Sequence, residues 1–264
     1  MYYGRDMNAV IREFSMYERS GLSVTSLTGR LFADSTVIRI PSLKLLTPHS
    51  EMNFTAQTYW ELINNTYTGR LTARFNARIG KQDVLLFAGG LPETFKEAYP
   101  FRPLVIHAGT EGNLKQMQIS RFTAELPGAF SLNGGGEFWN LTDSVKRNGN
   151  MDFEMHTQNL NFLTGLADIA PDGSIIVPDS MHLAARVGME GTQCTAALKL
   201  LEKEGVLNLD AAYNLATEAY HADLASTTCR CITSCPRTLS ILLRQRCPLK
   251  DKGWMWHHER LWLL

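Results

Sequence analysis

The sequence predicts a mainly β protein built on an elongated, rolled or taco-shaped antiparallel sheet with a solenoid-like groove and one or two short helices. Two observations favour this fold class. Apolar and polar residues alternate in many successive runs, as they do in strands that bury only one face. Few stretches have the apolar spacing of a helix, so the sequence offers no set of helices that would cover the apolar faces of these strands.

Residues 6–19, at the N-terminal end, fit either a helix or a strand. Phe14, Met16 and Glu18 fit a strand that enters a turn at Ser20-Gly21. The apolar residues near helical spacing are Met7, Val10, Ile11, Phe14 and Tyr17. Periodicity leaves both structures open.

The clearest strand is expected over residues 69–79. Its apolar face holds Leu71, Ala73, Phe75, Ala77 and Ile79, and its polar face holds Arg70, Thr72, Arg74, Asn76 and Arg78. A short helix is expected next, over residues 91–100, because Pro92 suits a first turn and Pro100 ends the segment.

Further strands are expected over residues 150–156, 181–189, 206–215 and 219–224, separated by turn residues. Their apolar faces hold Met151, Phe153, Met155, Met181, Leu183, Ala185, Val187, Met189, Leu207, Leu209, Ala211, Tyr213, Leu215, Tyr220, Ala222 and Leu224. The run Gly134–Gly136 precedes strand-like residues rather than a helix start. A glycine bulge or bend is therefore favoured over a phosphate-binding loop.

The composition of the chain limits the classes of function that it can have. The chain has 264 residues, 44% of them hydrophobic, and 26 basic residues balance 26 acidic ones. Zero net charge without a basic block argues against nucleic-acid binding, because phosphate contacts need clustered Lys and Arg. The opening residues MYYGRDMNAV carry charges where a signal peptide has its apolar core, and no run of about 18 apolar residues, the length of a membrane span, occurs. The chain is thus expected to be either cytosolic or an internal piece of a longer exported protein.

No motif for catalysis or metal binding stands out. The histidines are scattered, and neither a nucleophile elbow nor a nucleotide-binding loop occurs. Carboxylates are plentiful but never concentrated. The sequence therefore predicts a protein that is not an enzyme, with no catalytic residues, no metal site and no cofactor.

The character of the chain changes near residue 226. Alternation stops there, and three of the five tryptophans follow, at positions 254, 256 and 262. Four of the five cysteines also lie there: Cys229, Cys231, Cys235 and Cys247. Restoring one base after the codon of Ala225 permits a strand-like continuation in the neighbouring reading frame. Residues 226–264 are therefore predicted to be an aberrant, out-of-frame and disordered tail.

Two other interpretations of these cysteines stay open. A structural zinc site usually needs paired C-x₂₋₄-C knuckles or well-spaced histidines, whereas the spacing of Cys229 and Cys231 is tighter, and His257 and His258 would require a long loop. A disulfide would form in an oxidising compartment.

Three phrases carry a resemblance to a known family. They are VIREFSMYERSGLSVTSLTGRLFADSTVIRIPSLKLLTPHSEM, GTEGNLKQMQISRFTAELPGAFSLNGGGEFWNL and EGVLNLDAAYNLATEAYHADLA. Their cadence, with G-N-L and F-x-A-x-L followed by L-x-G-x-x-x-N-L, resembles the TamB and AsmA-like envelope proteins of Gram-negative bacteria. The resemblance covers about residues 7–225, which are expected to be an internal β-groove segment.

The resemblance implies a long periplasmic protein in the cell envelope, anchored in the inner membrane by a helix that this chain lacks. The implied role is the passage of phospholipid between membranes, or outer-membrane protein assembly and translocation with a TamA-like outer-membrane barrel as partner. The implied ligand is the acyl chain of a phospholipid.

Physical reasoning from the strand faces agrees with a lipid groove. Apolar area exposed to water costs about 25 cal/mol per Å², and bound acyl chains relieve that cost. The residues expected to line the groove are Leu71, Ala73, Phe75, Ala77, Met181, Leu183, Val187, Leu207, Leu209 and Tyr213. The same residues also suit a closed sandwich core. A secreted solenoid or sandwich that binds glycans or adheres, with Trp60 and Trp139 as platforms, is the alternative function.

Overall fold

The computed structural model describes residues 6–19, 21, 23–63, 69–87, 90–166, 180–203, 205–227 and 241–243. The described part is dominated by thirteen strands of eight to eleven residues, followed by one strand of three residues. The strands are β1 (Met7–Tyr17), β2 (Ser23–Ala33), β3 (Val37–Leu46), β4 (Glu51–Tyr59), β5 (Leu71–Ile79), β6 (Leu104–Gly112), β7 (Gln116–Leu126), β8 (Phe130–Trp139), β9 (Asn148–Thr157), β10 (His182–Glu190), β11 (Gln193–Glu202), β12 (Gly205–Asn214), β13 (Tyr220–Thr227) and β14 (Ile241–Leu243).

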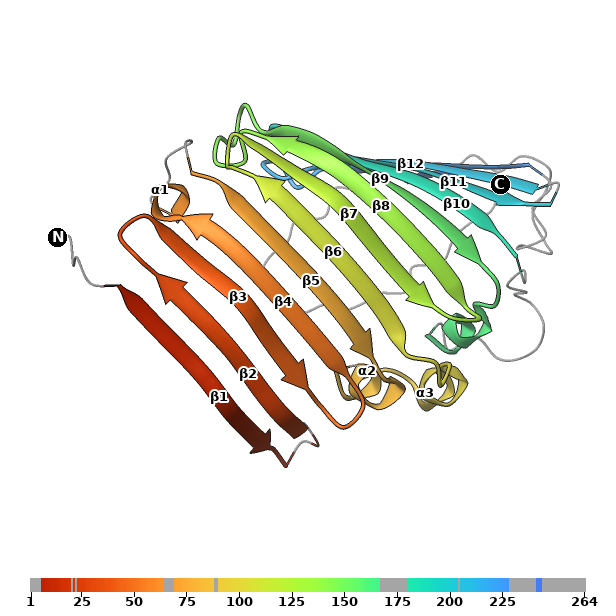
Figure 1. Ribbon diagram of the computed structural model, residues 1–264. Coiled ribbons are helices and arrows are strands. Elements are labelled where there is room, and N and C mark those ends of the chain that lie inside the picture. The colour runs from red at the N-terminus through yellow and green to blue at the C-terminus, as the bar shows by residue number, and fades with distance from the viewer. Residues whose placement is uncertain are drawn as a thin grey trace.

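These strands form a single sheet in which sequence order and spatial order coincide. Each strand pairs antiparallel with the strand before it and the strand after it, from β1 to β14. In Figure 1 the sheet runs as one broad, twisted surface from β1 to β12. It stays open, because the two outermost strands, β1 and β14, lie at opposite ends of the strand order and do not pair with each other. The predicted mainly β, antiparallel fold class is confirmed.

Short helices occupy the connections between strands. They are α1 (Trp60–Ile63), α2 (Lys81–Phe87), α3 (Glu93–Ala98) and the 3₁₀ helix η1 (Asn161–Leu166). The described part thus has three short α-helices where one or two were expected. The predicted helix over residues 91–100 is α3, which follows Pro92 and ends before Pro100. Figure 1 shows α2 and α3 together at one end of the strands.

The individual strand predictions are confirmed with small shifts at their ends. The expected strands over 69–79, 150–156, 181–189, 206–215 and 219–224 are β5, β9, β10, β12 and β13. The ambiguous N-terminal stretch is the strand β1, and every residue in it is exposed. The three consecutive glycines lie inside β8, opposite a register shift in β7 between Ile119 and Phe122. The glycines thus lie within a strand and not before a helix start, and the extra residue of the bulge is in β7.

The pairing register sorts the side chains into two faces. Residues directly opposite each other in neighbouring strands lie on the same face. We call one such line of partners the central apolar row. It consists of Leu43, Phe54, Phe75, Ala108, Phe122, Gly134, Phe153, Ala185, Leu198, Leu209 and Leu224. The face of the sheet that carries it is the apolar face, and the opposite face is the polar face.

The helices α2, α3 and η1 cover one end of the apolar face. Phe95 and Tyr99 of α3 pack with Phe162 of η1, and the ring centroids lie 5.5–5.8 Å apart. This cluster also contains Leu126, at the end of β7, which is 1% exposed. Burial raises the pKa of the Tyr99 phenol, because its ionised form loses hydration. The fully packed core thus lies beside the ends of the strands.

Candidate functional site

The apolar face is the candidate site, because most of it is only partly covered. Every residue of the central apolar row keeps partial exposure to solvent, and none is fully buried. At the covered end of the same face, Ala124 and Leu126 are buried. A continuous apolar surface therefore extends from β3 to β13 beyond the reach of the described helices.

The predicted groove residues come together on this face. The register places nine of them on the apolar face, in the three strands β5, β10 and β12: Leu71, Ala73, Phe75, Ala77, Leu183, Val187, Leu207, Leu209 and Tyr213. Val187 and Tyr213 remain 43% and 38% exposed, and Ala77 is buried.

Met181 differs from the other predicted groove residues. It precedes β10 and lies in the core cluster with α3 and η1, where it is 9% exposed. Its backbone N–H donates to Thr157 Oγ1 at 2.9 Å, and its carbonyl accepts a hydrogen bond from the Thr157 backbone N–H. Met181 therefore belongs to the covered end of the face and not to its open part.

A hollow of about 310 Å³ lies on the apolar face, over β4 to β9. Side chains that line it include those of Phe54, Phe75, Ala108, Ile119, Phe122 and Met151. Sequence analysis identified Phe75 but missed Phe54, Ala108, Ile119 and Phe122 as lining residues. Phe54 lies opposite Phe75 and Ala108 lies on its other side, so strand register was the missing information.

The glycines of β8 shape this hollow. Neighbouring strands lie about 4.8 Å apart, so side chains on β7 and β9 are normally separated by about twice that distance. Here the rings of Phe122 on β7 and Phe153 on β9 meet edge to face, with centroids 6.3 Å apart. A Cβ added to Gly134 would lie 2.7 Å from the Phe153 ring. The side chains of β7 and β9 thus lean over β8, where glycine leaves the space.

The covered end of the apolar face is held in place by a buried carboxylate. Asp83 of α2 is 8% exposed and accepts hydrogen bonds from the hydroxyls of Thr47 and Ser50, at the β3–β4 turn. Ser50 Oγ in turn accepts the backbone N–H of Gly80 at 3.0 Å. These bonds hold the start of α2 against the ends of β3 and β4.

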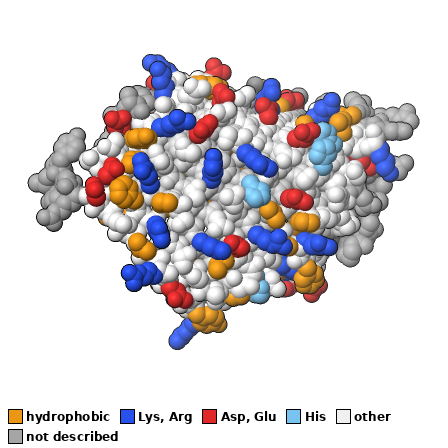
Figure 2. Space-filling model, viewed as in Figure 1, with side chains coloured by type: hydrophobic (Ala, Val, Ile, Leu, Met, Phe, Trp, Pro, Cys, Tyr) orange, Lys and Arg blue, Asp and Glu red, His pale blue; other side chains and the backbone are white. Residues whose placement is uncertain are grey.

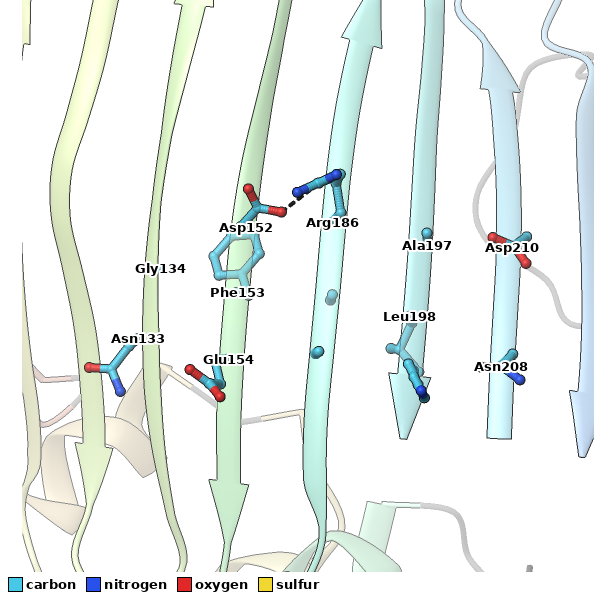
Figure 3. A pocket seen from close by; sticks show the side chains of 13 residues that line it. Asn133, Gly134, Asp152, Phe153, Glu154, Arg186, Ala197, Leu198, Asn208 and Asp210 are labelled. Atoms are coloured by element: carbon cyan, nitrogen blue, oxygen red, sulfur yellow. Dashed lines mark hydrogen bonds and ion pairs between the residues drawn. The ribbon is translucent and has the colours of Figure 1, made fainter. Parts of the chain in front are cut away.

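The polar face carries charges of both signs. Figure 2 shows Lys, Arg, Asp and Glu side chains spread across the sheet. A hollow of about 750 Å³ lies over β8 to β12, where Ala184 and Ala197 leave room among longer side chains. In Figure 3, Asp152 of β9 points toward Arg186 of β10, and Arg186 Nε donates to the carboxylate at 2.6 Å. This bond raises the pKa of the Arg186 guanidinium.

A second hollow of the polar face, of about 470 Å³, is lined by Arg39, Arg70 and Arg74 among other residues. Arg70 pairs with Glu111 at 3.4 Å between exposed side chains. The two polar-face hollows are lined by charged and amide side chains together with apolar groups, whereas the lining of the hollow on the apolar face is almost entirely apolar.

The polar face also brings together two histidines that seemed scattered in the sequence. His156 is the penultimate residue of β9, and His182 is the first residue of β10. The register places them directly opposite each other. Alternation assigns each histidine to a polar face, but only the hairpin register pairs them. Cys194, which is partly buried on β11, is free, and the cysteines and histidines of the tail lie outside the described residues.

The tail itself can be compared with the structure only at β14. Residues 228–240 and 244–264 lie outside the described residues, and Ile241–Leu243 pairs antiparallel with β13. The strand β13 continues to Thr227, just beyond the predicted boundary at residue 225.

Comparisons with known proteins return no family model, no curated protein and no solved structure that matches this chain. In the described residues, no helix has both the length and the apolar character needed to cross a membrane.

Proposed function

We propose that the apolar face binds the acyl chains of phospholipids. The chain would act as a non-enzymatic segment of a cell-envelope protein that carries phospholipid between membranes, or that assists outer-membrane protein assembly and translocation. The observation that carries the proposal is the central apolar row, whose residues all remain partly exposed across eleven consecutive strands, β3 to β13.

The free energy of apolar exposure supports a hydrocarbon ligand. Each Å² of apolar surface left in water costs about 25 cal/mol, and the row extends over a long series of strands. In most folds a second layer of helices or strands covers such a face and removes that cost. Here α2, α3 and η1 cover one end of the face. A flexible hydrocarbon chain, with no hydrogen bonds to satisfy, suits the remaining strip of Leu, Phe, Ala and Met side chains.

The resemblance to TamB and AsmA-like proteins supports the same ligand and adds a cellular setting. On this proposal the segment works in the periplasm as part of a longer protein anchored in the inner membrane. A TamA-like outer-membrane barrel is then its proposed partner, through regions outside this chain. The repeated strand pattern that carries the resemblance, over about residues 7–225, is compatible with the open antiparallel sheet.

The test is to fill the apolar hollow and to measure bound lipid. Ala108→Trp places an indole in the hollow between Phe75 and Phe122, both of which line it. His107→Trp is the matched control, since the adjacent residue projects from the polar face. Both proteins are purified, extracted and analysed for phospholipid by mass spectrometry. We expect Ala108→Trp to carry much less lipid than the control, with an unchanged circular dichroism spectrum.

Two outcomes would reject the proposal. If the unmodified chain carries no phospholipid and does not take it up from vesicles, the apolar face has another occupant or is closed as a sandwich core. If Ala108→Trp and His107→Trp retain equal amounts of lipid, the hollow is not the binding surface.

A further inference from the structure

Three metal-binding side chains meet on the polar face, at the end of the β9–β10 hairpin. His182 Nε2 lies 2.8 Å from Glu154 Oε1, and His156 Nε2 lies 3.9 Å from the same oxygen. The two imidazole rings are stacked, with centroids 4.4 Å apart and an interplanar angle of 13°. Within the described residues, this is the one group in which three His, Cys, Asp or Glu side chains bring ligand atoms within 4.8 Å of one another.

The backbone fixes the two histidines as close neighbours. The Thr157 N–H donates to the Met181 carbonyl at 2.9 Å, so Thr157 and Met181 face each other as a hydrogen-bonded pair. In an antiparallel ladder, hydrogen-bonded pairs alternate with pairs that lack these bonds and whose side chains approach more closely. His156 and His182 form the next pair. Thr157 and Met181 are both buried, so this end of the hairpin is anchored in the core.

We propose that Glu154, His156 and His182 form a binding site for a divalent transition-metal ion, zinc in the first instance. Zinc binds imidazole nitrogen and carboxylate oxygen at about 2.0–2.2 Å, which places tetrahedral ligand atoms roughly 3.4 Å apart. The observed separations bracket that value. Small rotations of the exposed Glu154 and His156 and the partly exposed His182 bring all three side chains to one ion, and water completes the coordination.

The donor set selects the class of metal. Imidazole favours Zn²⁺, Cu²⁺ and Ni²⁺, whereas Mg²⁺ and Ca²⁺ prefer oxygen ligands only. The site lies on the face opposite to the central apolar row, so it is independent of lipid binding.

Isothermal titration calorimetry of ZnCl₂ into the full chain tests the site, in a reducing buffer and with MgCl₂ as a second titrant. We expect zinc to bind and magnesium not to bind. Glu154→Gln, His156→Asn and His182→Asn are each expected to weaken zinc binding at this site by about tenfold or more. The double variant His156→Asn with His182→Asn should bind one zinc ion fewer per chain.

His221→Asn is the matched control. His221 is also an exposed strand histidine beside a carboxylate, with Nε2 2.6 Å from Asp223 Oδ2, but that pair offers only two donors. We expect this variant to bind as much zinc as the unmodified chain. Any zinc held by the cysteines of the tail is common to all these variants. Equal zinc stoichiometry and affinity in the double variant and the unmodified chain, with unchanged thermal unfolding, would overturn the proposal.

Discussion

Asp83 shows how a single residue fixes the covered end of the apolar face. Its carboxylate is buried, yet the hydroxyls of Thr47 and Ser50 and the backbone of Gly80 form one connected set of hydrogen bonds with it. A buried carboxylate is tolerated when such donors replace water. Loss of Asp83 would leave the buried hydroxyl of Ser50 and the partly buried hydroxyl of Thr47 without this acceptor.

We therefore expect Asp83→Ala to lower the free energy of unfolding by about 1–3 kcal/mol. Urea unfolding followed by circular dichroism measures the change. Glu93→Ala is the control, because the pair of Glu93 with Lys96 is largely exposed on the Glu93 side, and such a pair contributes about 0–1 kcal/mol. An effect of Asp83→Ala no larger than that of Glu93→Ala would show that these hydrogen bonds do not stabilise the end of the sheet.

Asp34 gives the β2–β3 turn a pH dependence. Its Oδ1 accepts the backbone N–H groups of Thr36 and Val37 at 2.7 and 2.8 Å, and these bonds lower its pKa from 3.8. A carboxyl whose pKa is lower in the folded state stabilises the fold above its unfolded-state pKa. That contribution is lost as the pH falls through the folded-state value. Above pH 3.8 the charged form supports the turn.

Asp34→Ala should therefore lower the unfolding midpoint at pH 7, and the difference from the unmodified chain should shrink as the pH falls below 3.8. Urea midpoints of both proteins across this pH range measure the effect. A difference that stays constant, or grows toward low pH, would contradict this account of the turn.

At the scale of elements, β8 determines how the apolar face bends. Its glycines let Phe122 and Phe153 meet across the strand. Gly136 is the tightest of them, because an added Cβ would overlap the backbone carbonyl oxygen of Asn150. At Gly109, in β6, the added Cβ would meet only the hydroxyl of Ser120, at 3.2 Å, and that side chain can move.

We expect Gly136→Ala to destabilise the fold by about 1–3 kcal/mol, the usual cost of an overpacked site. Gly109→Ala should cost clearly less. Thermal and urea unfolding of both variants provide the comparison. Equal destabilisation by the two substitutions would mean that β8 has no special role in bringing β7 and β9 together.

Element identity was largely predictable from the sequence, whereas side-chain neighbours were not. Alternation in residues such as Leu71 to Ile79 predicts a strand directly, because the side-chain period of a strand is two. The helix α2 was missed, since its residues 84–87 are an apolar run without helical periodicity and its buried Asp83 looks like a surface residue. The pairing of His156 with His182 depends on register, which alternation alone does not determine.

The site was predictable to the same extent. Groove residues on β5, β10 and β12 were found by alternation, and the register places them on one face. Met181 was placed in the open groove because it continues the alternation of β10. Met181 is buried by α3, which is distant in sequence, and by η1, which follows β9. Its position therefore depends on tertiary packing, which alternation does not reveal.

At the scale of the whole molecule, the open meander explains why the apolar face is long. Each strand from β3 to β13 adds one residue to the central apolar row, and no described strand returns to form a second layer. In such a sheet each strand contacts mainly the strands adjacent to it. The proposed lipid ligand would replace the missing layer, which makes the occupancy of the two faces the central question.

Site-specific photo-crosslinking tests that question most directly. Benzoylphenylalanine is introduced singly at Phe75, Phe153 and Leu209 in the apolar row, and at the adjacent polar-face positions Arg74, Asp152 and Asp210. Each protein is irradiated with vesicles that contain labelled phospholipid. We predict labelling at the three apolar-face positions and little at their polar-face neighbours. Equal labelling on both faces, or none at Phe75, Phe153 and Leu209, would contradict the lipid-binding account.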